Sequence, residues 1–388
     1  MARIRPLTAS CAAPVPVARP RLPSAASILP YLRQIDANAW YANHGPLAQE
    51  FQSQLGAHWG LARHQVALLS NGTSALTLAL LASGIRPGQR CLMPSWTFIA
   101  SAGAVRQAGL LPHFVDVRPD TWTPDPDELE GLAARHDIGA ILAVSPFGAP
   151  LDLPAWDRLQ RATGLPVIID GAAAFDTLRE GGPMLVGGCP VIVSLHATKV
   201  FGVGEGGAVL SRDAGLMERV RRLAQFGFLG TREALLPGVN AKMSEYAAAV
   251  GLAGLDGWPE TRARWSAVTD RYRSHLPTGV VVPPGFGKDW VSSTLNVLMP
   301  ADRADAMGDL AAQGIGALRW WGPGCHAQPA FRDCPAEPLP ITEDLARRSL
   351  GLPFWQDLTE AQVAAVCQAA SRCCTPRLRH PVHALVAA

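Results

Sequence analysis

Lys199 lies in the segment Ser194–Gly207, where a strand, a glycine-rich turn and a second strand follow one another. The apolar run Pro190–Ser194 predicts a buried strand and Ala208–Leu210 predicts another, so the amine lies where two strands and a loop meet. Desolvation at such a place lowers the pKa of a lysine, and an amine with a lowered pKa can attack an aldehyde and form a Schiff base. A solvated lysine on a surface loop is the alternative, and this segment alone leaves both interpretations open.

A carboxylate, Asp170, ends the short apolar run Pro166–Asp170. Parallel strands present ligand-binding groups at their C-terminal ends. A reactive amine and a carboxylate together suit pyridoxal phosphate (PLP), because the pyridine ring of this cofactor needs a negative partner at its nitrogen to act as an electron sink. The alternative is an aspartate that caps a helix or forms an Asx-turn before Gly171–Ala174.

The segment Val66–Leu81 predicts a strand, a small polar turn and a helix. Free backbone amides and the positive end of the helix dipole at Gly72, Thr73 and Ser74 can hold a phosphate dianion, and the hydroxyls can add hydrogen bonds. Ser194 can supply one more hydroxyl to this phosphate. An ordinary N-cap has the same residue types.

These three segments resemble the DegT/DnrJ/EryC1/StrS family of sugar aminotransferases, which are PLP enzymes of fold type I. Other matching segments follow in the same order: Trp40–Pro46, Pro94–Phe98, Phe114–Val117, Gly204–Gly207, Gly238–Glu245 and Pro329–Phe331. The resemblance implies that Lys199 carries the cofactor and that Asp170 pairs with its ring nitrogen. It also implies that Thr73, Ser74 and Ser194, beside Gly72, hold its phosphate.

The resemblance suggests further residues around the cofactor and the substrate. Of the two aromatic residues in Pro94–Phe98, we prefer Trp96 as the ring that stacks on the pyridine, although an aromatic residue at a strand end is more often part of the core. His326 matches a histidine near the family's substrate site. Arg319 and Lys242 are candidates for contacts with a diphosphate, although such residues at loop edges are usually only solvated.

A homodimer is implied only by the resemblance. Active sites in the family are completed across a twofold axis, and Asn240 would reach the phosphate that the partner subunit binds. We therefore expect a homodimer with shared active sites.

Ala173 is the clearest departure from the family pattern. Many relatives place glutamine or histidine there against the cofactor ring, so this contact must be absent or come from another residue. Gly171 replaces the usual alanine, and Lys242 replaces a common arginine. Retention of Lys199 separates the chain from the family's sugar dehydratases, which have histidine at that position. A regulator that binds PLP without turnover is the alternative from a different class of function.

The activity that the resemblance implies is transfer of an amino group from L-glutamate to a keto-deoxysugar nucleotide by a ping-pong mechanism. We favour a 4-keto-6-deoxyhexose, giving a 4-amino sugar for polysaccharide or antibiotic biosynthesis, because Trp320–His326 resembles members that make 4-amino sugars. A 3-keto sugar or cyclitol aminotransferase of the same family is the alternative.

Composition is typical of a soluble enzyme. Lysine and arginine number 34 and aspartate and glutamate 32, which gives a charge of +2 and no indication of a nucleic-acid or membrane partner. The eight cysteines have neither CxxC pairs nor zinc spacing, so we expect reduced thiols in the cytoplasm and no metal site. No apolar stretch reaches membrane-spanning length.

The chain of 388 residues exceeds the usual size of one core, which predicts two domains. Alternating strand and helix signals predict an α/β fold with a mostly parallel sheet flanked by helices, followed by a smaller C-terminal α+β domain. The resemblance to fold type I implies seven strands. The expected division is a flexible N-terminal arm at 1–30, a large PLP-binding domain at 31–255, a small domain at 256–374 and a tail at 375–388.

Overall fold

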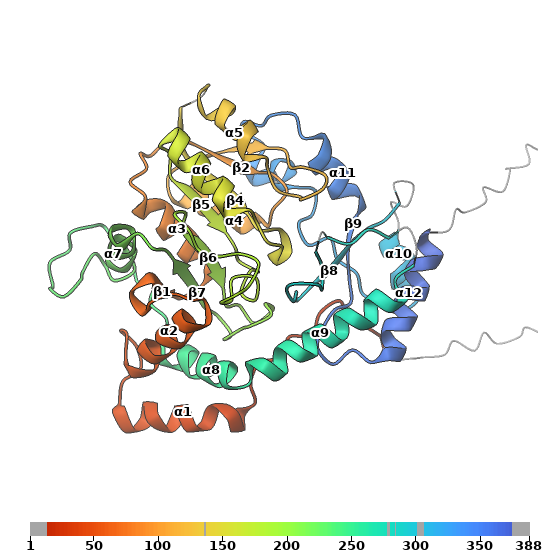
Figure 1. Ribbon diagram of the computed structural model, residues 1–388, viewed down its shortest axis with the longest axis horizontal. Helices are drawn as coiled ribbons and strands as arrows, with labels where there is room; N and C mark the ends of the chain where they lie inside the picture. Colours follow the sequence, from red (N-terminus) through yellow and green to blue (C-terminus); the bar gives the residue numbers. More distant parts are fainter. Residues whose placement is uncertain (1–13, 136, 278–279, 284, 301–305, 375–388) are drawn as a thin grey trace, which may run out of the picture.

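The computed structural model describes residues 14–374 except 136, 278–279, 284 and 301–305. The expected tail at 375–388 and the first thirteen residues of the expected arm lie outside the described residues. Within this part of the chain, a large α/β unit is followed by a smaller unit at its side (Figure 1).

A seven-stranded sheet forms the centre of the large unit, in the order β1-β7-β6-β5-β4-β2-β3. All pairings are parallel except the two that β7 makes with its neighbours β1 and β6. The prediction of a mostly parallel sheet with seven strands is therefore confirmed. The strands are β1 Val66–Leu69, β2 Arg90–Pro94, β3 Leu111–Val115, β4 Ile138–Val144, β5 Val167–Asp170, β6 Val191–Ser194 and β7 Gly207–Leu210.

Helices cover both faces of this sheet, because successive strand residues point to opposite sides. On β5, for example, Val167 and Ile169 belong to one core and Ile168 to the other. One face is covered by α2 Pro46–His58, α5 Pro126–Ala133, α6 Leu153–Thr163 and α8 Glu245–Asp256, and the other by α3 Gly72–Ala82, α4 Ile99–Gln107 and α7 Ala214–Leu223. Because both faces of the sheet are buried, the strands have continuous apolar sequences, as in β4, in which every residue is buried.

The small unit begins with a long helix, α9 Trp258–His275, close to the expected boundary at 255/256. An antiparallel pair of strands, β8 Leu295–Leu298 and β9 Ser349–Leu352, lies beside it. The described part of this unit also contains the α-helices α10 Ala306–Ala311, α11 Pro340–Arg348 and α12 Glu360–Cys374, of which α12 packs on α9 and α10.

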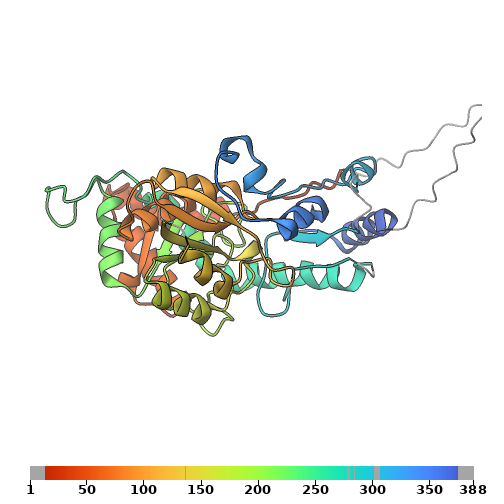
Figure 2. The same ribbon diagram turned by 90° about the horizontal axis from the view of Figure 1, so that it is seen from above.

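The N-terminal segment differs from the expected arm at 1–30, because helix α1 (Ala25–Asn38) begins well before residue 30. The Ser24 side chain caps this helix by accepting a hydrogen bond from the Ser27 amide at 3.2 Å, a common helix start. Before the helix, residues 14–23 form a strap that runs along the small unit (Figure 2). In this strap, Val15 exchanges backbone hydrogen bonds with Gly314 and Gly316.

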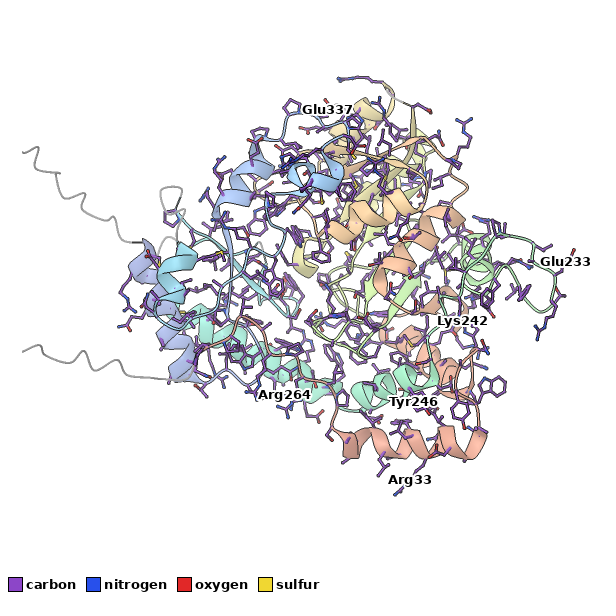
Figure 3. All side chains as sticks on the ribbon, turned by 180° about the vertical axis from the view of Figure 1, so that it is seen from behind. Arg33, Glu233, Lys242, Tyr246, Arg264 and Glu337 are labelled. Carbon is purple, nitrogen blue, oxygen red and sulfur yellow. The ribbon has the colours of Figure 1, made fainter. Side chains whose placement is uncertain are left out.

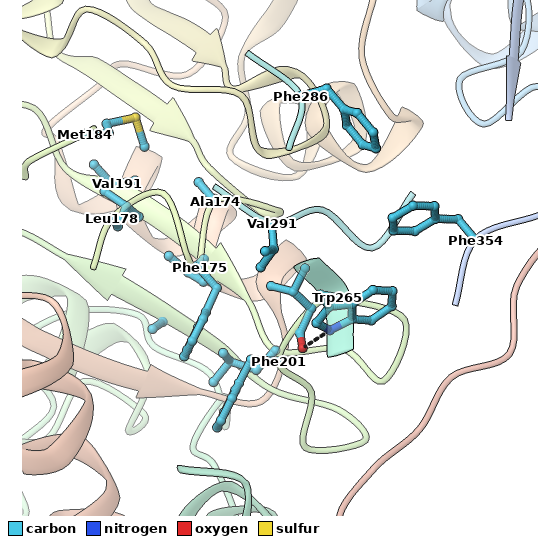
Figure 4. Close-up of a cluster of buried hydrophobic side chains, with 14 of the residues drawn as sticks. Ala174, Phe175, Leu178, Met184, Val191, Phe201, Trp265, Phe286, Val291 and Phe354 are labelled. Atoms are coloured by element: carbon cyan, nitrogen blue, oxygen red, sulfur yellow. Dashed lines mark hydrogen bonds between the residues drawn. The ribbon is translucent and has the colours of Figure 1, made fainter. Parts of the chain in front are cut away.

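Two contacts join α9 to the loops beyond the sheet. The Trp265 indole donates to the Val200 carbonyl at 3.0 Å, within a cluster of buried hydrophobic side chains (Figure 4). Asp176, fully buried, accepts hydrogen bonds from Arg262 Nε of α9 at 2.7 Å and from the Val291 amide at 2.9 Å. A buried carboxylate without such donors would lower the stability of the folded state. The hydrogen bonds to Asp176 therefore hold the small unit against the large one.

We expect Asp176→Asn to lower the free energy of unfolding by about 2 to 3 kcal/mol, because the charge that binds Arg262 is removed from a buried site. Urea denaturation followed by circular dichroism measures this loss. Asp344→Asn is the matched control: its carboxylate is about one-third exposed and pairs with Arg348 on the same helix, so its loss should cost below about 1 kcal/mol. Equal effects of the two substitutions would contradict the role assigned to Asp176.

Candidate active site

A cavity of about 750 Å³ lies at the C-terminal ends of β5 and β6, between the sheet and the small unit. Both Lys199 and Asp170 line it, and so do Gly72, Thr73, Ser74 and Ser194. The structure thus brings together the amine, the carboxylate and the phosphate-binding residues that the sequence predicts.

Lys199 is positioned by the turn that connects β6 to β7. Backbone hydrogen bonds from Leu195 to Gly206 and from Ala197 to Gly204, both 2.9 Å, close this turn. The side chain is half-buried at the cavity wall. Desolvation lowers the pKa of its amine, and the nearby Asp170 charge opposes this shift only in part. A lowered pKa raises the uncharged fraction of the amine, which is the form that attacks an aldehyde.

Asp170 ends β5 and is buried beside the same cavity. Ser101 Oγ of α4 donates to its Oδ2 at 2.6 Å, and the Ala172 amide donates to its Oδ1 at 3.1 Å. Burial raises the pKa of this carboxyl group, whereas the two hydrogen bonds and Lys199 lower it. Sequence reasoning missed Ser101, whose only signal is a hydroxyl residue in the first turn of an otherwise small and apolar helix.

The turn from β1 to α3 forms a cradle against the end of β6. Asn71 caps α3 by accepting from the Ser74 amide at 2.7 Å, and the amides of Gly72 and Thr73 lie in the first turn, where a helix offers them no acceptor. A Cβ on Gly72 would lie 3.2 Å from Ser194 Oγ and 2.9 Å from its Cβ. The amides, the helix dipole and the Ser194 hydroxyl therefore converge on one place, which fits the phosphate of PLP.

Residues 24–371 match the model of the DegT/DnrJ/EryC1/StrS aminotransferase family. The chain belongs to this family. It is 30% identical to the dTDP-4-amino-4,6-dideoxy-D-glucose transaminase of Escherichia coli, over 91% of this chain and 96% of the relative. It is 28% identical to the GDP-perosamine synthase of Escherichia coli O157:H7, over 87% of this chain and 93% of the relative. The crystal structure of DesI with its TDP-sugar product superimposes with a TM-score of 0.84 at 32% identity, covering 94% of each chain.

Membership in the DegT/DnrJ/EryC1/StrS family confirms the resemblance, the fold class and the class of enzyme, a PLP-dependent aminotransferase. Among the described residues, no cluster of side chains suits a metal ion. None of the helices within 14–374 that the structure describes is long and apolar enough to cross a membrane.

Of the two aromatic residues in Pro94–Phe98, the one that lines the cavity is Phe98 rather than Trp96. Trp96 is 2% exposed, packs edge-on against Trp321 with ring centroids 5.3 Å apart, and is not among the lining residues. Phe98 is 55% exposed and lines the cavity. The chain turns after Pro94 so that Trp96 enters a buried cluster, while Phe98, the N-cap residue of α4, lines the cavity.

The three predicted substrate residues lie outside the cavity of their own subunit. His326 Nδ1 is 2.7 Å from Ser95 Oγ, which fixes the ring beside the end of β2. Arg319 donates to the Ala346 carbonyl at 3.0 Å. Lys242 lies 4.7 Å above the ring of Phe226. Within this chain these side chains therefore have structural partners and do not line the cavity that holds Lys199.

Asn240, the residue expected to serve the partner subunit, is exposed in the loop after α7. Its Oδ1 accepts a hydrogen bond from Lys242 Nζ at 2.6 Å, and it does not line the cavity of its own subunit. Asn240 therefore does not contact a phosphate in the cavity of its own chain. Its exposed position leaves it free to contact a phosphate in a second chain.

An aromatic wall lines the part of the cavity that faces the small unit, and sequence reasoning did not predict it. Its six members come from four separate segments of the chain: Phe147, Trp265, Trp320, Trp321, Phe354 and Trp355. The rings of Phe147 and Trp321 stack with centroids 4.0 Å apart. Ala173 also lines the cavity, and its carbonyl packs so closely on Gly148 that a Cβ there would lie 2.5 Å from the oxygen.

We expect Gly207→Ala to weaken PLP binding by at least about tenfold, which corresponds to about 1.4 kcal/mol. A Cβ at Gly207 would lie 2.5 Å from the carbonyl carbon and oxygen of Asn71, so the cradle must move away from Ser194. Titration of the apoenzyme with PLP, followed by absorbance, measures the change.

Gly103→Ala is the matched control, because a Cβ on Gly103 meets no atom within 4 Å. This substitution in the middle of α4 should leave PLP binding unchanged and raise stability by about 0.5 to 1 kcal/mol. Wild-type affinity in Gly207→Ala would show that the close approach of Gly207 and Asn71 does not hold the cradle.

Proposed function

We propose that this enzyme moves an amino group from L-glutamate to a keto-deoxysugar nucleotide, with a 4-keto-6-deoxyhexose as the favoured acceptor and a 4-amino sugar as the product. The observation that carries the proposal is one cavity of about 750 Å³ with a reactive amine and a buried carboxylate in its wall. This volume lies in the upper part of the usual range for ligand sites, about 300–1,000 Å³, and leaves room for more than an amino acid. Two relatives named for 4-amino sugars support the choice of acceptor.

PLP, when bound, supplies an aldehyde and a pyridine ring that stabilises negative charge on the reacting carbon. Asp170 is positioned to accept a hydrogen bond from the protonated ring nitrogen, and Ser101 orients its carboxylate. Thr73, Ser74 and Ser194 hold the phosphate. Lys199 Nζ would hold the aldehyde end of PLP, and its amine would be the base available to move a proton at the reacting carbon of the substrate.

A ping-pong order is expected if both substrates react at one cofactor site, which would hold the transferred amino group between them. The chain has three lysines, Lys199, Lys242 and Lys288, and of these Lys199 lines the cavity. Donor and acceptor would therefore use the same cofactor site in turn, so the keto acid should leave before the keto sugar binds. Retention of the Lys199 and Asp170 pair in one cavity favours turnover over the role of a PLP-binding regulator.

A homodimer is the second part of the proposal. Exposed aromatic side chains gather where the loop 226–243 leaves the large unit: Tyr41 and Tyr246 stack with centroids 6.3 Å apart, and Phe226 is 48% exposed. Figure 3 shows Tyr246 and Lys242 on the side of the molecule away from the small unit, with Glu233 in the projecting loop. Exposed apolar patches of this kind are typical of interaction sites, and they flank Asn240, which serves a phosphate site only from a partner chain.

A cytoplasmic location is the third part. Six cysteines are free among the described residues: Cys91, Cys189, Cys325, Cys334, Cys367 and Cys373. Free buried thiols suit a reducing compartment.

The amino transfer is tested in two half-reactions on the PLP-loaded enzyme. We expect L-glutamate to convert the visible band of the bound cofactor to that of its amine form, and a dTDP-linked 4-keto-6-deoxyhexose to restore the band. Lys199→Ala should show neither step, whereas Lys288→Ala, which removes an exposed lysine, should behave like the wild type. Restoration by a 3-keto sugar alone would overturn the choice of acceptor. A band that glutamate does not change would contradict L-glutamate as the amino donor and would favour the alternative of a PLP-binding regulator.

The dimer is tested by sedimentation. Tyr246→Asp places a charge in the proposed apolar contact and should raise the dimer dissociation constant at least about tenfold. Asn240→Ala should leave the dimer intact and speed the loss of PLP. Leu185→Asp, at an apolar side chain 61% exposed elsewhere on the large unit, is the control and should change neither quantity. A monomeric wild-type protein that retains PLP would refute the shared site.

A further inference from the structure

The N-terminal strap forms part of the cavity wall. Residues Ala18–Arg21 line the cavity although they lie far in sequence from Lys199. The strap is fixed on both sides of this stretch: the Phe354 amide donates to the Val17 carbonyl at 3.0 Å, and Arg21 forms an ion pair with Asp357 at 2.6 Å. Figure 2 shows the strap running from α1 along the small unit. Its central residues are therefore held at the cavity.

Arg19 is the exposed cation at the centre of this stretch. The charged or ionisable residues that line the cavity are Arg19, Arg21, Asp170, His196, Lys199 and Glu205. Arg21 is paired with Asp357, and His196 Nε2 lies 3.6 Å from Glu205. Among the described residues, no hydrogen bond or ion pair engages the Arg19 guanidinium, so its charge is available to a ligand.

The backbone of Arg19 is held in place by its neighbour. Pro20 fixes its own φ and restricts the preceding residue to extended conformations. Little conformational freedom of the main chain then remains to be lost when the side chain binds a ligand. The guanidinium itself presents a planar fork of donors that suits phosphate oxygens.

We propose that Arg19 binds the diphosphate of the nucleotide sugar at the mouth of the cavity. This inference rests on the proposed function. The reacting carbon of either substrate must reach the half-buried Lys199, so the rest of a nucleotide-linked sugar extends from there towards the rim. An exposed arginine at the rim meets that anionic part. Arg319 and Lys242, the cations that the sequence suggested, are engaged outside the cavity.

The carboxylates of L-glutamate are the other anions that enter the cavity. Glutamate is short, however, and must lie beside Lys199 to react. The diphosphate carries more negative charge and lies further from the reacting carbon. A guanidinium binds it with charge-assisted and bidentate hydrogen bonds. The geometry thus favours the acceptor over the donor as the ligand of Arg19.

The test uses the full-length, PLP-loaded enzyme and three variants: Arg19→Gln, Arg19→Lys and the control Arg33→Gln. Arg33 is exposed on α1 and points away from the molecule in Figure 3, so its loss removes the same charge without touching the cavity. Calorimetric titration with dTDP, UDP and GDP measures affinity at two salt concentrations. The L-glutamate half-reaction is followed by absorbance on the same samples.

We expect Arg19→Gln to weaken binding of the preferred nucleoside diphosphate by about ten- to a hundredfold and to reduce its salt dependence. Arg19→Lys should retain part of the affinity, and Arg33→Gln all of it. Glutamate conversion should proceed at the wild-type rate in every variant. Unchanged nucleotide affinity in Arg19→Gln, no nucleotide binding by the wild type, or a defect confined to glutamate conversion would each overturn the proposal. Failure of glutamate to convert the wild type would instead refute the proposed donor, and the titrations would still report on Arg19.

Discussion

The parallel pairing of β5 with β6 is the constraint on which the active site depends. In this pair Asp170 lies beside Ile192, so the ends of both strands reach the same edge of the sheet. Asp170 ends one strand, and Ser194 and the turn with Lys199 follow the other. An antiparallel arrangement would place these groups at opposite edges. The direction of two short, fully buried strands therefore decides whether the carboxylate and the amine can serve one cofactor.

Burial then sets the chemistry of these groups. The same desolvation that lowers the pKa of Lys199 raises that of Asp170, and each charge opposes the shift of the other. The hydrogen bond from Ser101 gives the carboxylate a second source of stabilisation that does not depend on the lysine. Asp170 therefore keeps a partner when Lys199 has lost its proton, which is the state in which the amine acts as a base.

How much of this site the sequence could predict depended on how local each signal was. Asp170 ends a strand, and Lys199 and the Gly72–Ser74 turn come within about five residues after one, so a strand pattern was enough to place them at one sheet edge. A strand pattern does not place Phe98, Ser101 or the aromatic wall at the cavity. The positions of Phe98 and Ser101 depend on how the chain turns after Pro94, and the aromatic wall depends on packing between distant segments. The choice of Trp96 shows this limit: two aromatic residues two positions apart differ only in which one the tertiary structure buries.

The position of the strap at the cavity could not be predicted from its sequence either. A segment rich in proline and arginine has no apolar pattern, and its sequence predicts a flexible arm. Its order comes instead from backbone groups of the small unit, through Val15 with Gly314 and Gly316 and through Val17 with Phe354. The small unit is in turn fixed by Asp176 with Arg262 and by Trp265 with Val200, the residue next to Lys199. One chain of contacts thus links the strap to the loop that carries the reactive amine. For this reason the strap and the loop with Lys199 belong to one connected structure, although more than 170 residues separate them in the sequence.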